Sequence, residues 1–190
     1  NNPYRFYEEK DVLLIGLYDG IYIYDYENNR ASLIKETESP VTCMICENDN
    51  IFYGTENGKI YDIFNDEPIS ERKGKITGLG FIENKLIDSN LEGEIYKTYD
   101  DKILYVFDRP ISSMKILDGK IFDKNGNDFA LIIGSDDGVY SIQGKQVKRI
   151  TKRDYLVTSL LDKKDYTLLD TDYVGNVYET LENEHIINLG

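Results

Sequence analysis

Gly58-Lys59-Ile60-Tyr61 and Gly93-Glu94-Ile95-Tyr96 are two copies of the short phrase that decides the fold of this chain. The phrase is a glycine, at most one further residue, then Ile or Val, then Tyr, and it recurs at intervals of 35 to 45 residues. The other three copies are Gly20-Ile21-Tyr22, Gly138-Val139-Tyr140 and Gly175-Asn176-Val177-Tyr178. Self-similarity at this period predicts a repeat architecture, in which no unit buries its apolar face without a neighbour.

A second phrase precedes the first in four of the repeats and indicates an earlier strand. It consists of a β-branched residue, Thr or Ser, a small residue and a large apolar residue. Its copies are Val41-Thr42-Cys43-Met44, Ile76-Thr77-Gly78-Leu79, Ile111-Ser112-Ser113-Met114 and Val157-Thr158-Ser159-Leu160. We expect four short strands in each repeat, which in the third repeat are residues 76–82, 85–89, 94–99 and 103–107. The small residue fits the first strand, because the innermost strands of a radial array crowd around its axis.

These strands predict an all-β fold, a five-bladed β-propeller of four-stranded antiparallel blades in a single domain over residues 1–190. The predicted blades are residues 1–39, 40–75, 76–109, 110–154 and 155–190. Two arrangements fit the repeats, a closed ring of five blades and five blades of a longer ring.

The two phrases together resemble the WD40 repeat, best over residues 40–65 and 75–100. Where that family has Trp-Asp at the end of the third strand, this chain has Tyr24-Asp25, Phe64-Asn65, Tyr99-Asp100 and Leu181-Glu182. The chain departs from the family in having no Trp and a single His. The resemblance implies a WD40-like propeller that binds a protein or short peptide within an intracellular complex.

Composition limits the classes of partner. The net charge of −13 argues against a nucleic-acid partner, because such proteins need a basic stripe. The longest apolar runs, such as residues 12–15, are too short to span a bilayer, so we expect no membrane segment. Cys43 and Cys46 lie three apart in an expected strand, so their thiols should point to opposite faces and not bridge. Two thiols without a disulfide framework favour an intracellular location, cytoplasmic or nuclear.

One insertion could hold a metal ion. It lies in the fourth repeat and resembles the calcium loop of FG-GAP propeller repeats, with its candidate ligands at Asp123, Asn125, Asn127 and Asp128. Its spacing is compressed and no bidentate Glu follows, so a plain solvated turn is the alternative reading. Acidic pairs such as Asp66-Glu67 and Asp100-Asp101 also fall in expected turns, where carboxylates are solvated rather than opposed across a catalytic pocket.

The propeller reading places the turns between second and third strands on one face, together with the connections between blades. That face should mix acidic, basic and aromatic side chains, a composition typical of protein interfaces. The candidate partner-binding residues are Tyr18, Asp19, Lys73, Arg109, Asp136, Lys152, Arg153 and Tyr173. We therefore expect a non-catalytic scaffold or adaptor subunit without a cofactor. The alternatives are a ligand-binding propeller, lectin-like or calcium-dependent, and a carbohydrate-active hydrolase.

Overall fold

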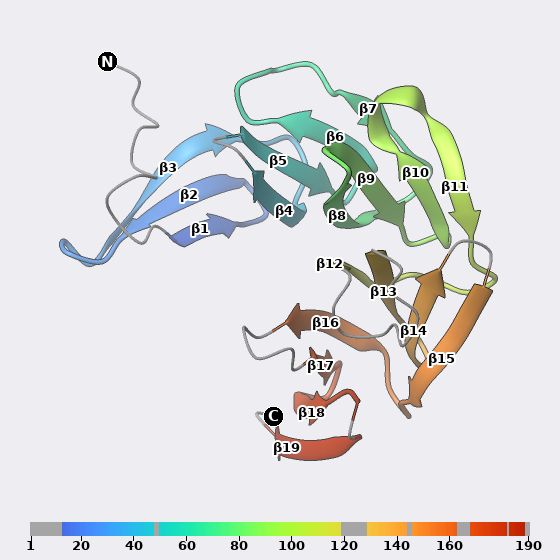
Figure 1. Cartoon of the computed structure of the whole chain (residues 1–190). Coiled ribbons are helices and arrows are strands. Elements are labelled where there is room, and N and C mark those ends of the chain that lie inside the picture. The colour runs from blue at the N-terminus through green and yellow to red at the C-terminus, as the bar shows by residue number, and fades with distance from the viewer. Residues whose placement is uncertain are drawn as a thin grey trace. The chain divides into compact units, whose positions relative to one another are not determined.

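The chain folds into antiparallel β-sheets. The structure is a computed structural model, and it describes residues 13–47, 50–118, 129–143, 146–162, 168–181 and 183–188. Its strands form five sheets, in each of which a strand pairs with the next one along the chain (Figure 1). These sheets are the blades of a β-propeller, so the predicted fold class is confirmed.

The first of two compact units, Asn1–Ile76, holds two sheets. The strands described in the first sheet are β1 (Leu13–Gly16), β2 (Gly20–Asp25) and β3 (Arg30–Glu36). The sequence predicts four strands for this blade, and residues 1–12 lie outside those that the structure describes. The second sheet consists of β4 (Val41–Glu47), β5 (Asn50–Thr55), β6 (Lys59–Asp62) and β7 (Ser70–Glu71). With two residues, β7 is the shortest strand that the structure describes.

The second unit, Thr77–Gly190, holds three four-stranded sheets. The strands of the first are β8 (Ile76–Ile82), β9 (Lys85–Asn90), β10 (Glu94–Lys97) and β11 (Lys102–Val106). The second sheet has β12 (Ser113–Asp118), β13 (Phe129–Ser135), β14 (Gly138–Gln143) and β15 (Gln146–Lys152). The third has β16 (Val157–Asp162), β17 (Leu168–Asp172), β18 (Asn176–Glu179) and β19 (Glu184–Asn188).

Successive blades pack through a small residue in one blade and a β-branched residue in the next. A Cβ built at Gly16 in β1 would lie 2.6 Å from Cγ1 of Val41, and one at Gly134 in β13 would lie 2.6 Å from Cγ1 of Val157. Val157 is fully buried, and Val41 is partly buried. In these two contacts the β-branched residue that opens the first strand of a blade therefore fills space that only glycine leaves in the blade before it.

The glycine of the repeated phrase is required by the backbone around it. Gly93 has φ of +90°, a conformation that residues with a Cβ rarely adopt. A Cβ at this position would also lie 2.6 Å from the carbonyl oxygen of Arg109 and still closer to that of Phe107. The turn between β9 and β10 therefore packs directly against the chain that leaves the same blade.

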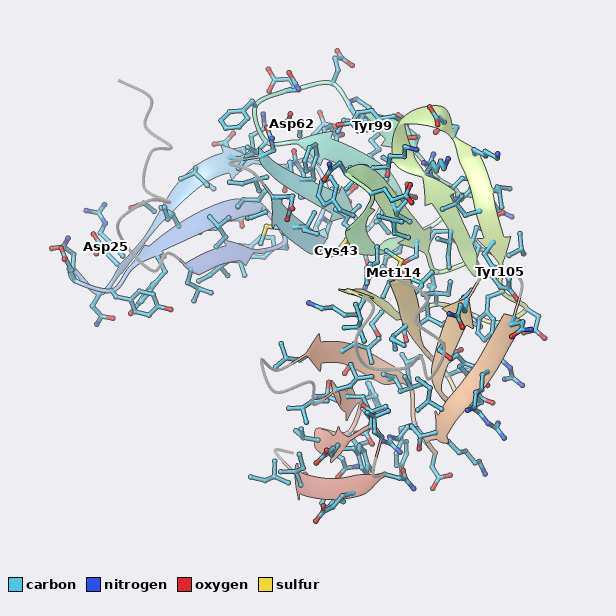
Figure 2. All side chains as sticks on the ribbon, viewed as in Figure 1. Asp25, Cys43, Asp62, Tyr99, Tyr105 and Met114 are labelled. Carbon is cyan, nitrogen blue, oxygen red and sulfur yellow. The ribbon has the colours of Figure 1, made fainter. Side chains whose placement is uncertain are left out.

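The core of the second unit is built from the strand faces of neighbouring blades. Met114, labelled in Figure 2, lies in a buried cluster with Ile95, Phe107 and Tyr140. The rings of Phe107 and Tyr140 meet edge to face, with their centroids 4.9 Å apart. The repeat tyrosine and the apolar residue before it thus help to join adjacent blades.

In three blades the third strand ends earlier than the sequence predicts, whereas in the first blade β2 ends at Asp25 as predicted. In the third blade β10 stops at Lys97, and a 3-10 turn, η2 (Thr98–Asp100), follows it. Tyr99, assigned by the WD40 resemblance to the position of the Trp, is 63% exposed (Figure 2), whereas Thr98 is fully buried. Phe64 and Leu181 are likewise exposed, and the residues before them, Ile63 and Thr180, are buried. In these three blades the residue assigned to the Trp position is thus exposed, and the residue before it is buried.

Candidate partner-binding surface

In the second, fourth and fifth blades, hydrogen bonds join the turn between the second and third strands to the connection from the preceding blade. The amide of Tyr173 donates to the carbonyl of Leu156 at 2.9 Å, and the amide of Glu56 donates to that of Pro40 at the same distance. Ser135 does this with its side chain, since its hydroxyl donates to the carbonyl of Pro110 at 2.8 Å. Turn and connection therefore form one surface in each unit, as the propeller reading requires.

In the second unit this surface carries exposed apolar groups beside charged ones. Tyr173 is 74% exposed, and Tyr155 and Leu156 are exposed in the connection next to it. We call the following residues the connection surface: Arg109, Asp136, Lys152, Tyr155, Leu156 and Tyr173. The turn after β13 and the connection after β15 lie in contact, because the amide of Arg153 donates to the carbonyl of Asp137 at 3.0 Å.

The charged part of the connection surface is an ion-pair cluster. Arg109 Nη1 lies 3.4 Å from Asp136 Oδ1 and 3.5 Å from Asp137 Oδ2, and Arg149 Nη1 lies 3.4 Å from that same Asp137 oxygen. The hydroxyl of Tyr140 donates to the other oxygen of Asp137 at 2.7 Å. The negative charge of Asp137 raises the pKa of Arg109 above its usual value. Two predicted residues, Arg109 and Asp136, are thus brought together, with both side chains still exposed to solvent.

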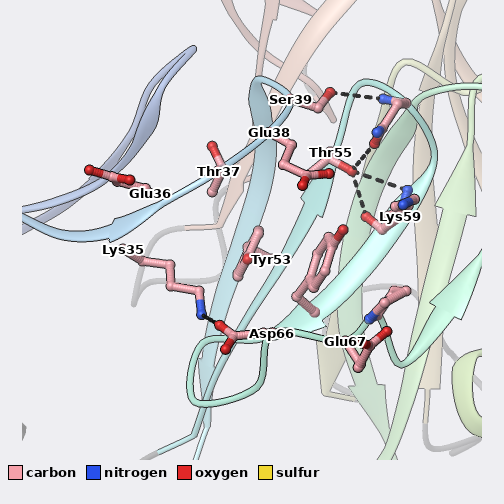
Figure 3. Close-up of a pocket in the computed structure, with 13 residues that line it drawn as sticks. Lys35, Glu36, Thr37, Glu38, Ser39, Tyr53, Thr55, Lys59, Asp66 and Glu67 are labelled. Carbon is pink, nitrogen blue, oxygen red and sulfur yellow. Dashed lines mark hydrogen bonds and ion pairs between the residues drawn. The ribbon is translucent and has the colours of Figure 1, made fainter.

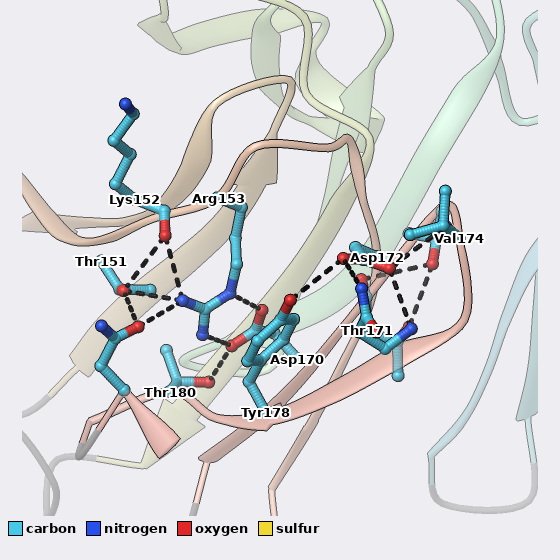
Figure 4. A network of polar contacts seen from close by, with 12 residues as sticks. Thr151, Lys152, Arg153, Asp170, Thr171, Asp172, Val174, Tyr178 and Thr180 are labelled. Atoms are coloured by element: carbon cyan, nitrogen blue, oxygen red, sulfur yellow. Dashed lines mark hydrogen bonds and ion pairs between the residues drawn. The ribbon is translucent and has the colours of Figure 1, made fainter. Parts of the chain in front are cut away.

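Arg153 does not belong to the exposed surface, so its assignment as a partner-binding residue is corrected. The residue is only 5% exposed, and its guanidinium binds both carboxylate oxygens of Asp170 at 2.7 Å (Figure 4). Its Cζ lies 4.0 Å from the centre of the Tyr178 ring. Thr180 completes the site by donating its hydroxyl to Asp170 at 2.8 Å. Arg153 therefore ties the end of the fourth blade to the fifth and is not available to a partner.

A second polar network holds the turn that presents Tyr173. Asp172 is buried, and its Oδ1 accepts hydrogen bonds from the amides of Val174 at 3.1 Å and Asn176 at 2.9 Å (Figure 4). Burial acts to raise the pKa of Asp172, but hydrogen bonds from Asn176, Val174 and Tyr178 outweigh burial and hold it below 3.8. Tyr173 is thus an exposed aromatic residue on a turn that is fixed from inside.

The remaining predicted partner residues, Tyr18, Asp19 and Lys73, lie in the first unit. Tyr18 is 76% exposed at the turn between β1 and β2. Asp19 accepts from the hydroxyl of Tyr22 at 3.1 Å through Oδ2, and its carbonyl accepts from the amide of Thr37 at 3.1 Å. Lys73 is exposed after β7. Tyr18 therefore resembles Tyr173 in its setting, and Asp19 acts as the acceptor that orders the turn beneath it.

The predicted metal ligands Asp123, Asn125, Asn127 and Asp128 lie outside the described residues, so the calcium hypothesis stays a prediction. Across the parts of the chain that the structure describes, no group of three or more His, Cys, Asp or Glu residues could hold a metal ion. Cys43 and Cys46 are thiols that form no disulfide with each other, as their spacing predicts. Within the same described ranges, no helix has the length and apolarity needed to cross a bilayer.

Sequence reasoning did not single out Tyr155, Leu156 or Arg149. Tyr155 and Leu156 stand between an Asp and the strand that starts at Val157. These two apolar residues precede the strand and do not follow its alternation of buried and exposed side chains, so their exposure could have been recognised. Arg149 could not have been recognised from the sequence, since it joins the ion-pair cluster only through Asp137 in the neighbouring hairpin turn.

No protein-family model matches the chain, and no curated protein sequence matches it. The WD40 β-propeller domain of Doa1 matches with a TM-score of 0.63 and 10% identity, over 93% of this chain and 64% of that one. A chain of the mitotic checkpoint complex matches with a TM-score of 0.61 and 12% identity, over 95% and 61%. The extracellular domain of BT4673, a one-component system from B. thetaiotaomicron, matches with a TM-score of 0.62 and 17% identity, over 86% and 25%.

The chain thus spans less than two thirds of the length of each of these three proteins. At such low identities the likeness shows the fold alone. The chain is a β-propeller, and WD40 propeller domains are among its structural neighbours.

Proposed function

We propose that this propeller is a non-catalytic platform for protein partners and that its connection surface is a docking site. The observation that carries the proposal is the exposed group of Tyr155, Leu156 and Tyr173 on hydrogen-bonded backbone beside the Arg109 cluster. Tyrosine and arginine dominate the binding energy of protein interfaces, because both combine a large contact area with polar groups.

The rigidity of the surface also supports this role. Ordering a mobile loop on binding opposes association, whereas Tyr173 stands on a turn already fixed by Asp172. Arg109 is also held in place by two carboxylates before any partner arrives. The partner would therefore meet a surface that needs little ordering.

We further propose that the protein works within an intracellular complex, in the cytoplasm or nucleus. The two cysteine thiols support this setting, because paired cysteines are usual in proteins of oxidising compartments. Among the structural neighbours, Doa1 and the checkpoint complex chain fit the proposal, while the extracellular domain of BT4673 is an example of a similar propeller in another setting.

The test is affinity capture of the tagged chain from its native lysate. It compares the unmodified chain with a double variant that carries both Leu156→Ser and Tyr173→Ser. We expect the double variant to lose at least tenfold of the stoichiometric partner while keeping its melting temperature. Tyr99→Ser is the matched control, because Tyr99 is also an exposed tyrosine but lies in η2, away from the turn–connection contacts. Equal partner recovery by the double variant and the control, or no stoichiometric partner for any of them, would refute the proposal.

A further inference from the structure

The first unit contains a pocket of about 400 Å³ that none of the predicted site residues lines. Its walls come from the end of β3 and the connection after it, from β5 and β6, and from the loop between β6 and β7 (Figure 3). The pocket exists because β7 has only two residues, so the chain between Ile63 and Ile69 leaves the side chains of β5 and β6 uncovered. Its volume falls in the range of about 300–1,000 Å³ that is typical of ligand sites.

Two parallel tyrosine rings form the aromatic part of this pocket. The centroids of Tyr53 and Tyr61 are 5.0 Å apart, with 13° between the ring planes. Tyr53 is 2% exposed, yet no described residue forms a hydrogen bond with its hydroxyl. Burial, together with the charges of Tyr61 and Asp66, raises the pKa of Tyr53 to about 12, so this hydroxyl stays protonated.

Tyr61 differs from the repeat tyrosines of the other four blades. In those blades the hydroxyl of the equivalent tyrosine donates to a nearby carboxylate, namely Asp19 from Tyr22, Glu94 from Tyr96, Asp137 from Tyr140 and Asp172 from Tyr178. Tyr61 has no such acceptor among the described residues. Thr37 lines the same pocket, and its buried Oγ1 also lacks a hydrogen-bond partner in the described part of the chain.

Thr37 Oγ1 is buried without a partner, which is unusual because buried polar groups are nearly always hydrogen-bonded. The hydroxyls of Tyr53 and Tyr61 line the same pocket and have no hydrogen bond to a described residue. The other polar groups at its end are satisfied and hold its shape. Thr55 Oγ1 bonds Asn57 Oδ1 at 2.7 Å and the carbonyl of Lys59 at 2.8 Å, while the amide of Asn57 donates to Ser39 Oγ at 3.2 Å. A ligand can therefore supply the missing bonds without rearranging the wall.

The charges around the pocket select the sign of that ligand. Lys35 Nζ is paired with Asp66 Oδ1 at 2.6 Å, and Lys59 Nζ lies 3.7 Å from Glu71 Oε1. No described cation pairs with Glu38 or Glu67, which lie on the connection after β3 and in the loop beside Asp66 (Figure 3). The pocket therefore has an excess of negative charge, which disfavours phosphate, sulfate and carboxylate ligands.

We infer that this pocket binds the side chain of an arginine from a protein partner. A guanidinium is planar, carries five N–H donors and one positive charge, and stacks on aromatic rings. Its donors match the hydroxyl oxygens of Thr37, Tyr53 and Tyr61, and its charge matches Glu38 and Glu67. A lysine ammonium offers three donors and no plane, so it would use fewer of these groups. This inference rests on the proposed role in protein binding and adds the chemistry of one contact.

The inference is tested without the partner, by NMR titration of the full chain with N-acetyl-arginine N-methylamide and with its uncharged analogue, N-acetyl-citrulline N-methylamide. We expect saturable shifts of the Thr37, Asn57 and Lys59 amides and at least tenfold weaker binding of the citrulline compound. Higher salt should weaken arginine binding, since the attraction is electrostatic.

Two variants at exposed residues of the pocket test the role of negative charge without disturbing the fold. Glu38→Gln and Glu67→Gln should each weaken arginine binding about threefold to tenfold at an unchanged melting temperature. Glu92→Gln, an exposed carboxylate in the turn of another blade, is the matched control and should bind as the unmodified chain does. Tyr53→Phe keeps the ring and should weaken binding by removing one acceptor.

The inference is overturned if the two compounds bind equally, if neither gives saturable shifts, or if the variants bind arginine as well as the control does. It is also overturned if glucose, galactose or N-acetylglucosamine binds the pocket in preference to arginine, which would make it a sugar site. Failure here is distinct from failure of the platform role. In the first case the Leu156 and Tyr173 variants still lose their partner, and in the second they do not.

Discussion

Removing the carboxylate of Asp170 should strongly destabilise the second unit. Asp170→Asn leaves the guanidinium of Arg153 buried, with 3% of its side chain exposed, and without a counter-charge. Two charge-assisted hydrogen bonds of 2.7 Å are lost or weakened, and each contributes about 1.5–3 kcal/mol. Removing one partner from a buried ion pair costs about 3–5 kcal/mol, which agrees with that sum. At about 2–4 °C per kcal/mol for a chain of this size, the melting temperature should fall by about 6–20 °C.

Urea unfolding followed by circular dichroism and tyrosine fluorescence measures this loss, since the chain has no Trp and 16 Tyr. The matched control is Arg149→Met, whose ion pair with Asp137 is largely exposed and should contribute less than about 1 kcal/mol. Replacing both Arg153 and Asp170 with Leu should recover most of the stability, because no unpaired charge then stays buried. A loss below about 1 kcal/mol for Asp170→Asn would refute the reasoning.

Three further outcomes follow from described contacts. Gly134→Ala should destabilise the protein by about 1–3 kcal/mol in urea unfolding, because the new methyl group overlaps Val157, and an unchanged midpoint would disprove the packing account. Tyr53 should titrate near pH 12 by absorbance at 295 nm; since its folded pKa is raised above 10.0, its contribution to stability is complete below pH 10 and lost towards pH 12, and Tyr53→Phe should remove that step. Asp172 has a folded pKa below 3.8, so the stability it provides is present above that pH and lost as pH falls through the folded value, and Asp172→Asn should flatten the acid limb of the stability curve.

The strands were predictable where the repeat itself sets them. The two phrases have the same spacing in the second and third repeats, and the strand from Ile76 to Ile82 has the predicted bounds. The end of β10 was not predictable in this way. Asp101 adopts a left-handed conformation with φ of +50° after the 3-10 turn, and no residue in that stretch is one that demands such a turn.

The candidate site was predicted only in part, for a physical reason. Exposure of Tyr18 and Tyr173 follows from their place in turns, and both are exposed in the structure. Whether a charged residue is buried depends on its partner, and Asp170 lies in another blade from Arg153. A basic residue in a connection therefore looks the same in the sequence whether it faces solvent or a buried carboxylate.

The pocket was missed because its cause is a shortened strand rather than a motif. Pro68 stands where the fourth strand of the second blade would begin, and a proline has no N–H to donate to a sheet. That residue was the available sign that Tyr53 and Tyr61 would lose their cover. The missing acceptor of Tyr61 needed the structure, since it is defined only by comparison with the other blades.

The close contact between turn glycines and backbone carbonyls also explains why the repeat is still recognisable in the amino-acid sequence. A Cβ at Gly58, Gly93 or Gly138 would meet carbonyl oxygens of the chain leaving the same blade. Side-chain pairs can be replaced together, as charge for charge or apolar for apolar, but a carbonyl oxygen offers no compensating substitution. Relatives of this chain should therefore be sought by the spacing of that glycine and its tyrosine rather than by the Trp-Asp pair, which this chain lacks.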